Sequence, residues 1–106
     1  MNDFMNVNER VKQIKVVSAE ADPGNANKVH VTLEIPYEAD KPNDLDQFFG
    51  VDAVKQLAIK EASAVTHKPA GWSQLSPLQY MKDGVKVLPT RECDAVRVIV
   101  TCLSMP

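Results

Sequence analysis

The chain has 106 residues, of which 44% are hydrophobic, 25% charged and 6% aromatic, and its formal net charge is −2. These values are ordinary for one globular domain with an aliphatic core, and they argue against an intrinsically disordered chain. The charge is divided unevenly, because residues 1–53 hold ten acids and five bases whereas residues 54–106 hold four acids and seven bases.

The first eight residues are polar apart from Phe4, Met5 and Val7. We expect residues 1–8 to form a flexible arm and residues 9–106 to form a single globular domain. The amino terminus lacks a charged segment followed by an apolar one, so no signal peptide is predicted. No apolar run approaches the roughly 18 residues of a transmembrane helix, so none is predicted and no membrane partner is expected.

Two cysteines, Cys93 and Cys102, lie nine residues apart in a segment predicted to be extended. At about 3.3 Å per residue their separation is about 30 Å, far beyond the roughly 7 Å that a disulfide allows between Cα atoms. Free thiols are typical of a reducing compartment, so the pair favours a cytoplasmic location.

The first predicted strand spans Val11 to Ala21, although Glu9 to Lys15 can instead form a helical turn. A cluster of turn residues follows from Asp22 to Asn27, and it predicts a hairpin loop longer than two residues. The next strand, Val29 to Pro36, has the clearest pattern in the chain. Its odd-numbered residues are apolar and its even-numbered ones are polar up to Glu34, so one face is predicted to be buried and the other wet.

Two helical patterns occupy the middle of the chain. Asp44 to Phe49 has capping-box spacing and ends at Gly50, which predicts a short helix. The segment from Val51 to Val65 is ambiguous, because alternation also allows a strand; its composition favours a helix capped by Asp52. The helical alternative places on one stripe Val54, Leu57, Ala58, Ala62 and Val65.

The segment from Thr66 to Leu75 is predicted to be a loop that Trp72 anchors to the core. Ser76 to Asp83 is predicted to be a second short helix, because Pro77 suits a first helical position, Gln79 completes a capping box and Gly84 can end it. A short strand, Val85 to Leu88, is predicted to end at Pro89.

The last predicted strand, Asp94 to Leu103, is apolar on both parities, which is typical of a strand in the middle of a sheet. The resulting fold class is α+β, with a mainly antiparallel sheet of four to five strands and two or three short helices. If residues 51–65 are extended, the order becomes that of an all-β barrel with one helix, similar to the oligonucleotide-binding barrel.

No catalytic, cofactor-binding or metal-binding motif is present, and we do not expect an enzyme. His30 lies on the polar face of its strand, and a role as a base would require Glu34 as its orienting partner. His67 lies in a predicted loop. Together with Cys93 and Cys102, the histidines lack the compact spacing of a metal site. The four glycines are isolated, so no phosphate-binding loop is predicted.

Two charged surfaces are candidate binding sites. One is an acidic face for a protein partner, and the other combines basic residues with aromatic rings on which bases of single-stranded nucleic acid can stack. The acidic face comprises Glu34, Glu38, Asp40, Asp44, Asp46 and Asp52. The nucleic-acid face comprises Lys55, Lys60, Lys68, Trp72, Tyr80, Lys82, Lys86 and Arg91.

The leading hypothesis is a small non-enzymatic protein-interaction module that self-associates in the cytoplasm, because open sheets leave edges that pairing can cover and the charge split suits head-to-tail contact. The alternative is a single-stranded nucleic-acid-binding domain similar to the oligonucleotide-binding barrel. The plain sequence is also compatible with an accessory protein of a phage or mobile element.

Overall fold

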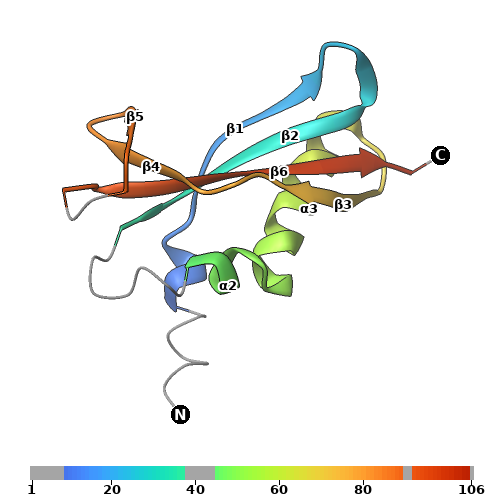
Figure 1. The fold of residues 1–106 in the computed structure, drawn as a ribbon. Helices are drawn as coiled ribbons and strands as arrows, with labels where there is room; N and C mark the ends of the chain where they lie inside the picture. Colours follow the sequence, from blue (N-terminus) through green and yellow to red (C-terminus); the bar gives the residue numbers. More distant parts are fainter. Residues whose placement is uncertain (1–8, 38–44, 90–91, 106) are drawn as a thin grey trace.

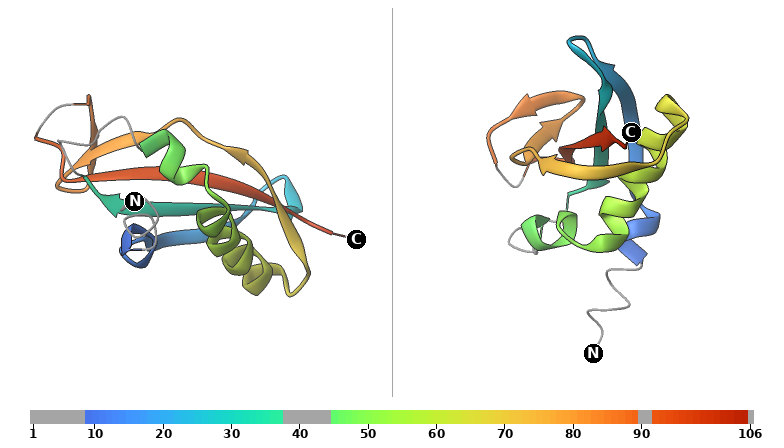
Figure 2. Two further views of the ribbon diagram at one scale, coloured as in Figure 1. Left: turned by 90° about the horizontal axis from the view of Figure 1, so that it is seen from below. Right: turned by 90° about the vertical axis from the view of Figure 1, so that its right-hand side faces the viewer.

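The computed structural model describes residues 9–37, 45–89 and 92–105. Within these ranges an antiparallel sheet curls into a half-barrel, and the helices pack against one of its faces (Figure 1; Figure 2). The predicted α+β class is therefore confirmed. The described elements are β1 (Lys15–Asp22), β2 (Asn25–Pro36), α2 (Leu45–Phe49), α3 (Asp52–Thr66), β3 (Ala70–Leu75), β4 (Gln79–Lys82), β5 (Val85–Val87) and β6 (Ala95–Ser104).

The centre of the sheet is the long pair formed by β2 and β6, with β1 on the other side of β2. Val29 lies opposite Cys102 and Ile35 lies opposite Val96, so the apolar parity of one strand matches that of the other. The predicted strand at residues 29–36 and the predicted central position of the last strand are both confirmed.

The β1–β2 hairpin has a two-residue turn, Pro23-Gly24, between the paired residues Asp22 and Asn25. The prediction of a longer loop was wrong, because the Asp22 carboxylate accepts a hydrogen bond from the Gly24 amide at 2.9 Å and stabilises the tight turn. Residues 9–12 form a helical turn and β1 begins only at Lys15. Of the two alternatives for this region, the helical one is therefore confirmed.

The segment from β3 to β4 runs along one edge of β6 and is interrupted at residues 76–78. At the interruption Ser76 donates its amide to the Ile99 carbonyl, and the Ile99 amide donates to the Ser76 hydroxyl, both at 2.9 Å. A side-chain oxygen thus replaces a backbone acceptor next to Pro77, which has no amide to donate. The predicted loop at residues 66–75 is wrong from Ala70 onward, where the chain forms β3.

The predicted helix at residues 76–83 is also wrong, because the chain forms β4 and then turns sharply into β5. Asp83 and Gly84 have φ values of 52° and 80°, and Lys82 pairs with Val85 across them. Two positive φ angles in a two-residue loop are typical of a type I′ hairpin turn, for which Asp-Gly is a favoured sequence. Gly84 therefore serves a hairpin, and the short strand predicted after it is confirmed as β5.

Both other helix predictions are confirmed as α2 and α3, although Asp44 lies outside the described residues. The N-cap of α3 is Val51, with no side-chain capping bond, so the predicted cap by Asp52 was wrong. Val65 is exposed rather than part of the buried stripe. Residues 52–66 are helical, so this segment is not the extended strand considered for the barrel. The half-barrel curvature of the sheet is nevertheless consistent with the alternative that resembles the oligonucleotide-binding barrel.

The core lies between the sheet and the helices. The inward side chains of β2 and β6 and those of Val54, Ala58 and Ala62 from α3 are almost fully buried. Phe48 and Phe49 of α2 join this cluster, and the Arg10 guanidinium lies 4.4 Å from the centre of the Phe48 ring. The core is aliphatic in the main, as predicted.

The predicted arm at residues 1–8 lies outside the described residues. None of the helices in the described ranges is both long enough and apolar enough to span a membrane.

Candidate functional site on the open face of the sheet

One face of the sheet carries no helix and is here called the open face. It displays the side chains of β2 and β6 that alternate with the buried ones. Facing pairs are His30 with Thr101 and Glu34 with Arg97. Figure 1 shows the helices on one side of the sheet, while the β1–β2 and β4–β5 hairpins rise on the other side at its two ends. The open face therefore has a hairpin at each of its two ends.

His30 is held by partners on two other strands. Its Nε2 atom lies 2.8 Å from the Asp22 carboxylate, and its Nδ1 atom lies 3.1 Å from the Thr101 hydroxyl. Nε2–H donates to the carboxylate, and the hydroxyl donates to Nδ1 when the ring is neutral or accepts from it when the ring is charged. The imidazole thus ties the tip of the β1–β2 hairpin to the central strand.

This contact lowers the pKa of the Asp22 carboxyl below its ordinary value of 3.8. The hydrogen bond from His30 is the largest cause, followed by the hydrogen bond from the Gly24 amide, and both favour the ionised form. The orienting partner of His30 is therefore Asp22, whereas the sequence suggested Glu34.

Glu34 instead pairs with the residue opposite it on β6. The Arg97 Nε atom donates to the Glu34 carboxylate at 2.7 Å, and both side chains are about three-quarters buried. A short charge-assisted hydrogen bond of this kind fixes the two side chains across the centre of the open face.

A pocket of about 450 Å³ lies beside His30 on the open face. It is open to solvent, and its walls are more apolar than polar. Among its polar residues, Glu20 is exposed, and its carboxylate has no hydrogen-bond or ion-pair partner among the residues that the structure describes. We call it the His30 pocket, and it is lined by Ser18, Glu20, Ala21, Pro23, His30, Thr32 and Ile99.

The described members of the predicted acidic face do not share one surface. Glu34 lies on the open face and is paired, whereas Asp46 and Asp52 lie on α2 and α3, on the helical side. Glu38, Asp40 and Asp44 lie outside the described residues. The acidic residue beside the pocket, Glu20, was not among those that the sequence singled out.

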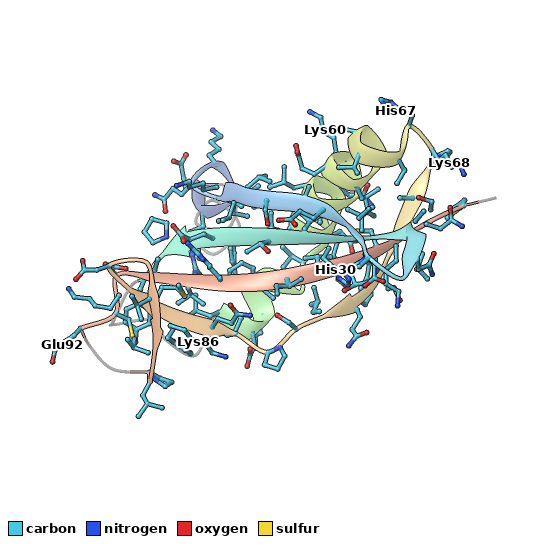
Figure 3. All side chains as sticks on the ribbon, turned by 90° about the horizontal axis from the view of Figure 1, so that it is seen from above. His30, Lys60, His67, Lys68, Lys86 and Glu92 are labelled. Carbon is cyan, nitrogen blue, oxygen red and sulfur yellow. The ribbon has the colours of Figure 1, made fainter. Side chains whose placement is uncertain are left out.

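The basic residues of the predicted nucleic-acid face are also dispersed. Figure 3, which looks onto the open face, shows Lys60 and Lys68 at one end of the molecule and Lys86 toward the other. Lys82 lies in the same hairpin as Lys86, and Arg91 lies outside the described residues. These side chains do not line one groove.

The two aromatic rings proposed for stacking are occupied by other groups of the chain. The Lys55 ammonium lies 4.0 Å from the centre of the Trp72 ring, which is 44% exposed at the edge strand β3. Trp72 therefore does not anchor a loop in the core. Tyr80 packs against the core and meets the Tyr37 ring edge-on, and burial raises the pKa of its hydroxyl.

The β4–β5 hairpin carries the most exposed apolar side chains described. Leu88 is 81% exposed and Val85 is 62% exposed, and Val87, which lies between them in the sequence, is also exposed. These three residues, here called the β5 patch, comprise Val85 and Val87 on the edge strand β5 and Leu88, which follows it directly. Lys86 lies within the patch and forms no ion pair among the described residues.

Cys93 and Cys102 are both free and buried. Burial raises the pKa of the Cys102 thiol, which keeps it protonated and unreactive. In the described ranges, no group of three or more His, Cys, Asp and Glu side chains is placed to hold a metal ion.

Fold and site together define an α+β domain with one helix-covered sheet face and one open, polar face that contains a small pocket. No family model, no curated protein and no solved structure matches the chain.

Proposed function

We propose that this chain is a small, non-enzymatic interaction module that self-associates through the β5 patch. The exposure of Val85 on the edge strand β5, and of Leu88 directly after it, carries this proposal. Large apolar side chains grouped on an edge are exceptional in monomers, because an uncovered edge can pair with other chains. A second copy that covers the patch removes these side chains from water.

The other two edges of the sheet are less suited to such contact. β1 has an irregularity in its pairing between Val16 and Ser18, and its exposed residues include charged ones. β3 has a similar irregularity near Ser73 and packs against α3. Bulges and charges are features that protect edges from pairing. β5 carries the charge of Lys86 but has no bulge in its register with β4.

The arrangement around His30 supports a structural role better than a catalytic one. Both ring nitrogens already have partners within the chain, so a substrate proton can be taken only if one of these hydrogen bonds breaks. Thr101, the nearest hydroxyl, is 9% exposed on the central strand. These features support the proposal that the module is not an enzyme.

Protein contact is favoured over nucleic-acid binding by the same geometry. The lysines lie on separate parts of the molecule, and Lys55 already packs against one face of the Trp72 ring. We also propose a cytoplasmic location, since two free cysteines are typical of proteins in a reducing compartment.

Sedimentation equilibrium over a micromolar concentration range tests self-association. The expected mass rises with concentration above the 11.7 kDa of one chain. In Leu88→Asp a charge replaces an apolar contact, and we expect association to weaken by about tenfold or more. The matched control is Val65→Asp, which places the same charge at an exposed apolar position on α3 and should associate as the wild type does. A mass of one chain at every concentration contradicts the proposal.

A further inference from the structure

The His30 pocket and the β5 patch lie at opposite ends of the open face and differ in chemistry. In Figure 3, His30 lies toward one end of the sheet and Lys86 lies toward the other. The pocket presents the Glu20 carboxylate, and the patch presents an ammonium among apolar side chains. Neither charge has an ion-pair partner among the residues that the structure describes.

We propose that the His30 pocket of one copy receives Leu88 and Lys86 of the next copy, so that self-association is head-to-tail. This inference rests on the proposed function, because it names the surface that covers Leu88 of the β5 patch. It also assigns an occupant to the pocket, a branched aliphatic side chain accompanied by a primary amine.

The two surfaces complement each other in polarity as well as in charge. Ala21, Pro23 and Ile99 supply an apolar wall for Leu88. Lys86 is two residues from Leu88, and positions two apart along an extended chain project to the same side. The ammonium can therefore approach Glu20 while the leucine enters the pocket.

Two acids lie near the incoming cation, Glu20 in the pocket wall and Asp22 beside His30, and only one of them is left for this contact. Asp22 is already bound to His30 and is influenced by the positive charge of Lys28, so Glu20 is the carboxylate left for an incoming cation. Asp83 at the tip of the hairpin carries the wrong charge for this pocket. The contact must therefore involve the side chains of β5 and Leu88 rather than the turn.

A heterologous contact has a consequence that an isologous one lacks. When one surface binds a different surface on the next copy, association continues into a ring or an open chain, whereas a contact of a patch with itself stops at two copies. The sedimentation profile of the wild type should therefore show species larger than dimers as concentration increases.

Charge reversal tests the pairing of Glu20 with Lys86. We expect Glu20→Lys and Lys86→Glu each to weaken association by about tenfold, because like charges then meet across the contact. The double variant, which restores opposite charges with their positions exchanged, should regain most of the lost association. Glu61→Lys is a control at a charged position on α3 and should leave association unchanged.

Mixing two defective variants tests the direction of the contact. Glu20→Lys retains an intact β5 patch, and Leu88→Asp retains an intact pocket, so an equimolar mixture should form two-chain species and stop there. If Leu88→Asp abolishes association while Glu20→Lys has no effect, the pocket contact is wrong and the proposed self-association stands. If the wild type has the mass of one chain throughout, both proposals are wrong.

Discussion

The two faces of the β2–β6 pair are built from alternate residues of the same strands, yet they differ in burial and in polarity. One face is aliphatic and covered by α3, with Leu33, Val98 and Val100 almost fully buried. The other carries the Asp22–His30–Thr101 hydrogen bonds and the Glu34–Arg97 pair. Alternation therefore places the buried core and the polar contacts on opposite faces of a single pair of strands.

This difference predicts at which positions a substitution lowers the free energy of unfolding most. On the covered face a shortened side chain leaves a cavity that the helices cannot fill, because protein interiors are closely packed. On the open face a shortened side chain is replaced by water. The variants below use this contrast, and they are ordered by the size of the expected effect.

The largest effect is expected at Leu33. Leu33→Ala should lower the free energy of unfolding by about 2–5 kcal/mol, because the side chain is fully buried between the sheet and the helices. Thr32→Ala, one residue away on the open face, is the matched control and should cost less than about 1 kcal/mol. Urea denaturation measures both. Equal losses would contradict the division of the strand into a structural and an open face.

The next effect concerns the ion pair at the centre of the open face. Arg97→Met should cost about 1–2 kcal/mol, because it leaves the Glu34 carboxylate partly buried without its donor. Adding Glu34→Gln should recover part of this loss, since the unpaired charge is then gone. Urea titrations of the two single variants and the double variant give the coupling energy. A coupling near zero would show that the pair does not stabilise the face.

The third effect concerns the turn that presents the β5 patch. Gly84 has a φ of 80° and open space around its missing Cβ, so Gly84→Ala changes only backbone strain, at a cost of about 1–2 kcal/mol. Gly24→Ala is the matched control in the other hairpin, where φ is not positive and the added Cβ meets Asp22 at an ordinary distance. Thermal unfolding should show a larger decrease in Tm for Gly84→Ala than for Gly24→Ala.

The pattern of the sequence predicts the covered face well and the edges poorly. Strict alternation from Val29 to Ile35 specifies a strand with one buried face, and the apolar β6 specifies its central neighbour. Between residues 66 and 83 the local pattern was misleading, because Ser-Pro-Leu-Gln satisfies the spacing of a helix cap. In the folded chain the Ser76 hydroxyl accepts a hydrogen bond from the Ile99 amide. Ile99 is 23 residues further along the chain, so local spacing does not reveal this contact. The Asp-Gly pair at residues 83–84 was the available signal for a hairpin.

The candidate site was only partly predictable for a related reason. His30 was correctly expected on a polar face, but its partner depends on how tightly the chain turns after β1. A two-residue turn brings the Asp22 carboxylate back to the imidazole, whereas the longer loop that was expected would not. Thr101 becomes a neighbour only through the register of β2 with β6, which pairs residues 71 positions apart.

The smallest effect is expected from the His30 contact, and it appears as a dependence on pH. The folded-state pKa of Asp22 lies below 3.8, so the contact stabilises the fold above that pH and the stabilisation is lost as pH falls through the folded-state pKa. The difference in stability between the wild type and Asp22→Asn should therefore shrink as pH falls below 3.8.

Thr101→Val is the control for this measurement, because it removes the hydrogen bond at Nδ1 and leaves the contact between Nε2 and Asp22 in place. Its difference from the wild type should stay nearly constant over the same acidic range. Urea midpoints recorded at several pH values distinguish the two profiles. If the Asp22→Asn difference is independent of pH, the imidazole–carboxylate contact does not hold the hairpin tip to the sheet.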